Sequence, residues 1–297
     1  RAYVLPHIGR QRLQAIRPAT LSTLYRTLLA SGGRDGRPLS VRTVEYVHAV
    51  LRKAFHDAVV SDQILGSNPA ERAKRPRKQG SVKRRDVWSA EQLRSFLVTA
   101  SEHRLSAFYR LAAYTGARRG ELLNLTWNDV VLEARTVRIR GSVGIVDGKR
   151  VEGTTKGGRE RVVSIDAGTA EILGQHLERQ QADEERAGGS WVTGDWVFRM
   201  EIGAPLFPDT VTALMAKLVR QHNQEAKEKG RPELPPMRLH DLRHVHATLL
   251  LRAGVPAHVV ASRLGHADPA ITLRVYAHVL EDQASEVAQV FAKVMEG

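Results

Sequence analysis

A basic stretch from residue 74 to residue 85 divides the chain of 297 residues into two segments with different patterns. It contains seven Lys and Arg residues together with a proline and a glycine, and it interrupts the apolar periodicity on either side. This composition is typical of a linker between folded domains, and the chain is long enough for two separate cores. We therefore expect a first domain over residues 1–80, a linker over residues 81–87 and a second domain over residues 88–297.

Most of the net charge lies in the first third of the chain. Residues 1–87 contain 18 Lys and Arg against 6 Asp and Glu, whereas residues 88–297 contain 27 against 26. Residues 1–87 therefore supply most of the net charge of +13. Such an excess favours a polyanionic partner, and we expect the first domain to bind nucleic acid. A basic surface that serves only solubility is the alternative.

The first domain is predicted to be all-helical. Residues 18–30 carry leucines at helical spacing, and Ser40 is a candidate N-cap for a longer helix with apolar positions from Val44 to Val59. Asn68 followed by Pro69 predicts the start of a short third helix. Polar residues between the apolar positions of the longer helix are expected to leave the core face and to be available for phosphates: Arg42, His48, Arg52 and Lys53.

The basic stretch itself is a second candidate contact with a phosphate backbone. Lys83, Arg84 and Arg85 close it, directly before the second domain. A linker with this charge would lie along DNA, because each neutralised phosphate releases counterions. A localisation signal or a disordered spacer has the same composition and remains an alternative.

The second domain is predicted to be mainly helical with a small antiparallel sheet. Ser89 and Gln92 have the spacing of a capping box, and Gly116 is a natural left-handed helix end. The period changes to that of strands near residues 137–139 and 162–165, with turn residues between them. The helices are expected at about 90–101, 104–115, 119–125, 168–187, 209–228, 241–253, 256–264, 268–278 and 281–295.

Composition excludes several classes of protein. The chain has no cysteine, which excludes disulfides, thiol catalysis and cysteine-bound zinc. No apolar run reaches the roughly 18 residues of a membrane span, and we expect no membrane partner. His240 and His244 have a spacing that could form half of a metal site, but no third ligand accompanies them. We expect neither a metal nor another cofactor.

Six residues that suit metal-free attack on a phosphodiester follow one another in a fixed order. Guanidinium groups match two non-bridging phosphate oxygens with paired hydrogen bonds. A phenol has a pKa of about 10, so it needs nearby cations or a base to become a nucleophile. Short motifs contain these residues, such as Thr115-Gly116-Ala117-Arg118 and His240-Asp241-Leu242-Arg243. The six are Arg118, Lys156, His240, Arg243, His266 and Tyr276.

In this arrangement and order the residues resemble the tyrosine recombinase, or phage integrase, family. The resemblance implies that Arg118 and Arg243 clamp the scissile phosphate, with His240 and His266 beside them. It implies that Tyr276 is the nucleophile and that Lys156, in a β-hairpin, is the general acid; Lys149 is the competing lysine. Supporting positions are expected for Glu121, which could instead pair with a neighbour, and for Asp241, which together with His244 could orient or cap its helix.

The resemblance also implies a reaction and an assembly. Tyr276 would form a 3′-phosphotyrosyl link, and two strand exchanges in a homotetramer on synapsed double-stranded DNA would pass through a Holliday junction. The expected activity is integration or excision of a phage or mobile element at core sites, in the cytoplasm of a bacterial host, with accessory DNA-bending proteins. Residues 281–297 are expected to form a C-terminal helix that docks on a neighbouring protomer or on its own domain.

Two other functions remain open at this point. A type IB topoisomerase shares the chemistry but relaxes supercoils as a monomer, and a DNA- or junction-binding protein would not cleave. Many family members also carry an N-terminal domain that binds arm sites. Residues 3–9 resemble the start of the core-binding domain instead, so we expect that an arm-binding domain has been removed.

Overall fold

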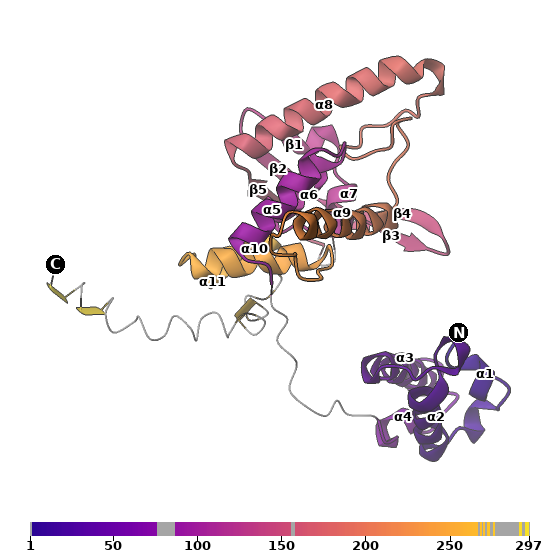
Figure 1. Cartoon of the computed structure of the whole chain (residues 1–297). Helices are drawn as coiled ribbons and strands as arrows, with labels where there is room; N and C mark the ends of the chain where they lie inside the picture. Colours follow the sequence, from indigo (N-terminus) through magenta and orange to yellow (C-terminus); the bar gives the residue numbers. More distant parts are fainter. Residues whose placement is uncertain are drawn as a thin grey trace. The chain divides into compact units, whose positions relative to one another are not determined.

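The computed structural model describes residues 2–75, 87–155 and 158–266 and, beyond them, residues 268, 270, 272, 273, 276, 291, 292, 295 and 296. The chain forms two compact units, Arg1–Arg84 and Arg85–Gly297 (Figure 1). Each unit has a hydrophobic core of its own. Four of the predicted site residues lie outside the described residues: Lys83, Arg84, Arg85 and Lys156.

The described part of the first unit is helical. Its elements are α1 (Leu5–Ile8), α2 (Pro18–Ser31), α3 (Val41–Val60) and α4 (Pro69–Arg72), with short 3-10 turns at Leu13–Ala15 and Arg34–Gly36. Helix α3 begins where the side chain of Ser40 accepts a hydrogen bond from the Thr43 amide at 3.2 Å. Helix α4 begins where Asn68 accepts one from the Ala70 amide at 2.9 Å. The predicted caps therefore fix the helix starts.

One residue predicted to face solvent in this unit is buried. His48 lies in the core between α2 and α3, where its Nδ1 and the hydroxyl of Tyr25 are 3.0 Å apart. It lies four residues after Val44 and three before Leu51, so it shares the buried face of α3. The prediction that His48 leaves the core face is wrong, because the Tyr25 hydroxyl gives the imidazole a buried polar partner.

Three helices open the second unit: α5 (Ala90–Ser101), α6 (Ser106–Thr115) and α7 (Arg119–Leu123). The predicted capping box between Ser89 and Gln92 starts α5. Helix α6 ends at Gly116, whose φ of 63° is left-handed. A Cβ at this position would lie 2.6 Å from the side chain of Leu264 and 2.9 Å from that of His246, so a glycine allows a late part of the chain to pack against this turn.

Two small antiparallel sheets follow. Strands β1 (Val130–Val131), β2 (Thr136–Ile139) and β5 (Arg161–Ser164) form a sheet in the order β1-β2-β5. Strands β3 (Gly141–Val146) and β4 (Lys149–Thr154) form a separate hairpin. In β2, Val137 and Ile139 are buried whereas Arg138 is exposed, as the period of two in a strand requires. Strand β5 thus pairs along one edge of β2 and continues from the segment that contains Lys156.

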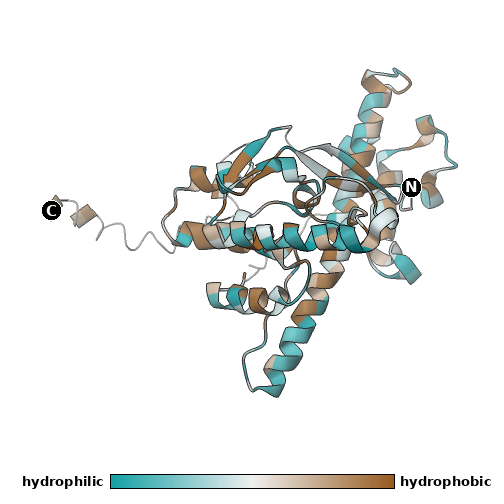
Figure 2. Ribbon diagram, turned by 90° about the horizontal axis from the view of Figure 1, so that it is seen from above, coloured by the Kyte–Doolittle hydropathy of each residue, from teal (hydrophilic) through white to brown (hydrophobic). Residues whose placement is uncertain are grey.

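The remaining described helices complete the second unit: α8 (Ala167–Ala187), α9 (Pro208–Glu228), α10 (Asp241–Arg252) and α11 (Ala257–Leu264). Brown and teal residues alternate along the helices in Figure 2, as expected for elements that bury one face. A chain of aromatic contacts runs through the core from Trp88 to Phe198, by way of Phe96, Tyr109 and Phe108. Helix α10 packs against both α6 and α11.

The predicted fold class is confirmed: an all-helical unit precedes a mainly helical unit with small antiparallel sheets. None of the described helices combines the length and the apolar character that crossing a membrane requires. The helices predicted at 268–278 and 281–295 fall largely outside the described residues.

Candidate active site

The first part of the site is the turn between α6 and α7. Arg118 directly precedes α7, and its main-chain N–H donates to Glu121 Oε2 at 2.8 Å. Its guanidinium Nη1 donates to the other carboxylate oxygen of Glu121 at 2.7 Å. Burial raises the pKa of Glu121, but hydrogen bonds from Arg161 and Arg118 outweigh it and hold the pKa below its ordinary value. Glu121 is therefore a buried carboxylate, 1% exposed, that orients Arg118.

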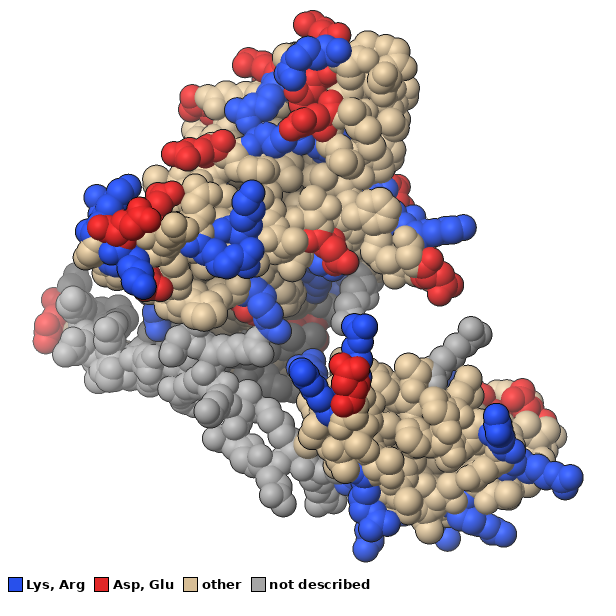
Figure 3. Space-filling model, turned by 45° about the vertical axis from the view of Figure 1, so that its right-hand side comes forward, with Lys and Arg blue, Asp and Glu red and all other residues tan. Residues whose placement is uncertain are grey.

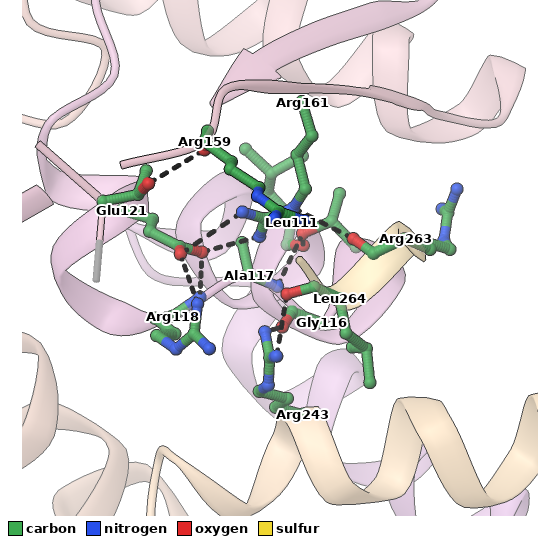
Figure 4. A network of polar contacts seen from close by, with 12 residues as sticks. Leu111, Gly116, Ala117, Arg118, Glu121, Arg159, Arg161, Arg243, Arg263 and Leu264 are labelled. Atoms are coloured by element: carbon green, nitrogen blue, oxygen red, sulfur yellow. Dashed lines mark hydrogen bonds and ion pairs between the residues drawn. The ribbon is translucent and has the colours of Figure 1, made fainter. Parts of the chain in front are cut away.

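A further arginine, which the sequence analysis did not single out, shares this carboxylate. Arg161 in β5 donates to Glu121 through Nη2 at 2.7 Å and through Nη1 at 3.3 Å (Figure 4). Its Nε donates to the main-chain carbonyl of Arg263 at 3.0 Å, near the end of α11. Arg161 thus connects β5 to both α7 and α11.

Arg243 approaches the same turn from α10. Its Nη1 donates to the carbonyl of Gly116 at 2.9 Å, and its Nη2 donates to the carbonyl of Leu264 at 2.7 Å. Burial and the charge of Arg118 lower the pKa of Arg243 to about 10, and Glu121 opposes this shift. The guanidinium is 4% exposed, and these two bonds to main-chain carbonyls bring it no negative charge.

Three imidazoles surround Arg243. The rings of His240 and His244 lie edge to face with centroids 5.6 Å apart. His266 follows α11, and its Nδ1 shares a hydrogen bond of 2.7 Å with the Thr272 hydroxyl. Burial, together with the positive charges of Arg243, Arg118 and Arg161, lowers the pKa of His266 to about 4. His266 is therefore neutral at physiological pH and lies within the field of all three arginines.

Tyr276 is buried beside these imidazoles. It is 3% exposed, and its hydroxyl lies 2.8 Å from Nδ1 of His244. Burial raises the pKa of Tyr276 to about 12, and Arg243 opposes this rise. Arg243 favours the phenolate, as expected of a nearby cation. Desolvation has the larger effect on the pKa of Tyr276, so the net shift favours the neutral phenol. With the His244 proton on Nε2, the phenol donates to Nδ1, and His244 is then placed to accept its proton.

The structure brings together five of the six residues predicted for the reaction. Arg118 and Arg243 interact electrostatically with each other and with both His240 and His266, and Tyr276 interacts with Arg243. The sequence pattern suggested that His244 orients or caps its helix or forms half of a metal site, and its contact with Tyr276 was not predicted, although its spacing from His240 indicated that both rings share a face.

Neighbouring charged residues have other contacts. Arg119 donates to the carbonyl of Pro208 at 3.1 Å and to the Thr212 hydroxyl at 2.8 Å, away from the Glu121 carboxylate. Asp241 accepts hydrogen bonds from the Arg238 amide at 3.2 Å and guanidinium at 3.1 and 3.2 Å, so it fixes the loop before α10. Among the residues that the structure describes, no cluster of three or more His, Asp or Glu side chains is suited to a metal ion.

The basic residues predicted to bind DNA in the first unit differ in their surroundings. Arg42 and Arg52 are exposed, whereas the ammonium of Lys53 forms an ion pair with Asp57 one turn later. Arg52 lines a groove of about 820 Å³ together with His48, Glu71, Ala73, Lys74 and Arg75. Blue Lys and Arg side chains project from several sides of this unit in Figure 3. Arg42, Arg52 and Lys53 are thus all exposed, and Lys53 differs by its ion pair with Asp57.

A model of the phage integrase family matches residues 86–283. Among curated proteins, the chain is 28% identical over 268 residues to a tyrosine recombinase XerC-like protein of Caldanaerobacter subterraneus subsp. tengcongensis, covering 84% of this chain and 66% of that protein. It is also 28% identical to the ICEBs1 integrase of Bacillus subtilis, covering 84% of this chain and 65% of that one. A match to an integrase of Streptomyces ambofaciens, also 28% identical, covers 99% of this chain and 72% of the relative. The chain therefore spans about two thirds of the length of the first two relatives.

Solved structures share the fold at lower identity. The Tn1549 transposon integrase in complex with transposon right end DNA has a TM-score of 0.74 and 19% identity, covering 96% of this chain and 88% of that one. A lambda integrase tetramer bound to a Holliday junction has a TM-score of 0.61 and 16% identity, covering 91% and 67%. These similarities show that both units have counterparts in the same architecture.

Proposed function

Because the chain belongs to the phage integrase family, we propose that it cuts and rejoins double-stranded DNA at specific sites through a covalent link to Tyr276. The phenol oxygen attacks the phosphorus, the bond to the 5′ oxygen breaks, and a 3′-phosphotyrosyl link and a free 5′ hydroxyl result. A 5′ hydroxyl from a partner strand reverses the step and releases the tyrosine. The phosphodiester energy is kept in the covalent link, so the reaction needs neither a nucleotide cofactor nor a metal.

The observation that carries this proposal is the charge of the buried cluster. Arg118 and Arg161 share one carboxylate, that of Glu121, whereas the bonds of Arg243 to other described residues go to main-chain carbonyls. Buried charges without a counterion are costly, so the cluster favours an additional anion. A phosphodiester under attack carries such a charge and gains more in the transition state, when charge grows on its oxygens. Arg118 and Arg243 are the donors we assign to it.

The imidazoles and the lysine complete the proton transfers. His244 accepts the phenol proton across the 2.8 Å contact, which is needed because the pKa of Tyr276 is raised to about 12. The neutral rings of His240 and His266 can donate to phosphate oxygens. Lys156 protonates the leaving 5′ oxygen, with Lys149 in β4 as the alternative; Asp241 supports the start of α10.

The family and its relatives also support a proposal for the roles of the domains and for the assembly on DNA. We assign residues 1–80 to core-site binding, residues 81–87, with Lys83, Arg84 and Arg85, to a linker along DNA, and residues 88–297 to catalysis. A homotetramer would synapse two sites, and residues 281–297 would dock between protomers. The transposon integrase in complex with transposon end DNA and the lambda integrase tetramer on a Holliday junction support this arrangement. Accessory DNA-bending proteins and the cytoplasm of a bacterial host belong to the same proposal.

Covalent trapping on randomised DNA tests the reaction whichever sequence the protein recognises. The protein is incubated in EDTA with a library of randomised duplexes, each carrying a nick. Cleavage near the nick releases a short fragment with a free 5′ hydroxyl, so that the covalent adduct cannot reverse. Adducts that resist SDS are recovered and sequenced. The expected result is a 3′-linked adduct of a single consensus that disappears in Tyr276→Phe. An adduct that persists in Tyr276→Phe, or binding without any adduct, would overturn the proposal; relaxation of supercoils without bridging of two sites would favour the topoisomerase alternative.

A further inference from the structure

Arg161 lies where three elements of the site meet. It belongs to β5, it donates to both oxygens of the Glu121 carboxylate beside α7, and it donates to the carbonyl of Arg263 in α11 (Figure 4). Its side chain is 11% exposed. All three bonds are made by one planar group, so a shift of β5, α7 or α11 would break at least one of them.

The turn before His266 packs directly against this guanidinium. Gly265 has a left-handed φ of 68°, and a Cβ there would lie 2.7 Å from Nη1 and 3.0 Å from Cζ of Arg161. The chain that leads to His266 is therefore fitted against Arg161 without space for a side chain. The position of Arg161 restricts the path of the residue that follows this turn.

The Glu121 carboxylate depends on Arg161 for its own orientation. Each carboxylate oxygen accepts one bond from Arg118 and one from Arg161, so four donors fix the plane of the group. Without Arg161, Glu121 would keep only donors from Arg118, and the Arg118 fork would be free to turn with it. A group of this kind acts on the reaction through the residue that it holds.

We infer that Arg161 is a positioning residue for the reaction: it holds Arg118 in its phosphate-facing orientation through Glu121 and ties this arrangement to the turn that carries His266. The inference rests on the proposed function, since it concerns the same site. A purely structural ion pair would stabilise the unit but would leave the rate of cleavage unchanged.

Single-turnover cleavage separates these two roles. Variants Arg161→Met and Arg161→Lys are compared with Arg138→Met, which removes the same charge from an exposed position on the neighbouring strand β2. The rate of adduct formation on saturating nicked DNA, the Kd for the same DNA and the melting temperature are measured for each. We expect Arg161→Met to slow adduct formation about 100-fold, as a displaced catalytic group does, with Kd within about twofold of the wild type.

The conservative variant gives an independent readout. A lysine at position 161 keeps the charge but cannot bridge both carboxylate oxygens and the Arg263 carbonyl as a planar fork does. Arg161→Lys should therefore recover part of the rate, and Arg138→Met should retain all of it. If Arg161→Met lowers the melting temperature enough to unfold the protein, the rate of adduct formation by Arg161→Lys distinguishes the positioning role from a purely structural one.

The pH dependence is the third readout. Glu121 faces Arg118 from its own element, Arg161 from β5 and Arg243 from α10. Burial raises the pKa of Glu121, and Arg161 is one of the groups that lower it. Without Arg161 the pKa of Glu121 should rise, so that Glu121 becomes protonated and releases Arg118 at a higher pH. The acidic limb of the pH–rate profile should therefore move to higher pH in Arg161→Met and stay in place in Arg138→Met.

The outcomes distinguish this inference from the proposed function. Wild-type rates in both Arg161 variants, or a loss that saturating DNA restores, would overturn the positioning role and leave the tyrosine mechanism intact. Failure of the wild-type protein itself to form an adduct would overturn the proposed function instead.

Discussion

The exposed arginines of the first unit and the buried arginines of the second unit have opposite surroundings. Arg42 and Arg52 lie on α3 in contact with solvent, whereas Arg243 is 4% exposed and shares its surroundings with Arg118 and Arg161. An exposed guanidinium stays hydrated, so its charge carries little desolvation free energy. It adds to the affinity for DNA, and salt weakens that contribution. A buried guanidinium carries an unfavourable desolvation free energy until an anion binds beside it. Under the proposed function, the charges assigned to DNA binding are therefore separate from the charges assigned to one phosphate.

Loss of the most buried cation should give the largest effect. Arg243→Met should slow adduct formation by about a thousandfold, the cost of removing a preorganised donor from developing charge, while Kd and its salt dependence stay near wild-type values. Single-turnover trapping and fluorescence anisotropy measure the two quantities. A large fall in affinity with cleavage preserved would place Arg243 with the binding charges instead.

His244 should give the next largest effect. His244→Phe removes the acceptor 2.8 Å from the Tyr276 hydroxyl and should slow adduct formation about 100-fold near neutral pH. Because burial raises the pKa of Tyr276 to about 12, the phenolate is scarce without a base and becomes more abundant as pH rises. The defect should therefore shrink at high pH. His258→Ala, at an exposed position in α11, is the control and should match the wild type across the range.

Neutralising the exposed pair should affect binding alone. The double variant Arg42→Gln, Arg52→Gln should weaken DNA binding about tenfold near physiological salt and reduce the slope of log K against log salt by about 1.8, if each arginine neutralises one phosphate. Cleavage at saturating DNA should not change. Lys53→Gln is a useful comparison, because Lys53 is already paired with Asp57 and should contribute less. An unchanged salt slope in the double variant would remove α3 from the DNA interface.

The smallest effect should come from the core that supports the site. Tyr109 is fully buried and donates its hydroxyl to the Val211 carbonyl at 2.8 Å, which joins α6 to α9. Tyr109→Phe should lower the free energy of unfolding by about 1 kcal/mol, the usual net worth of one such hydrogen bond. Urea denaturation measures it. Cleavage at 25 °C should be unaffected, and a large loss of activity would show that α6 contributes more to the site than packing.

Local signals predicted the helices well because caps and periodicity are local. Ser40, Ser89 and Gly116 mark helix boundaries through contacts within a few residues, and α5 was expected at the bounds that it has. His48 was placed wrongly because its environment depends on Tyr25, 23 residues earlier on another helix. Sequence spacing cannot show which buried hydroxyl a histidine will meet.

The sequence suggested candidate residues for the site but did not reveal their contacts. Motifs identified Arg118, Arg243 and Tyr276, and the structure places the first two around one turn. The pairing of His244 with Tyr276 and of Arg161 with Glu121 joins residues 32 and 40 positions apart. Such contacts follow from the packing of β5, α7, α10 and the segment after α11, which no local pattern encodes.

The bond between Arg243 and Gly116 joins residues 127 positions apart. At roughly 5–20 residues per second, the ribosome needs on the order of ten seconds to make the segment between them. The first unit has its own core and can fold during that time, whereas Arg243, His266 and Tyr276 emerge in the last fifth of this sequence. Under the proposed function, a nascent chain therefore completes the unit assigned to DNA binding before it contains the nucleophile that would cut DNA.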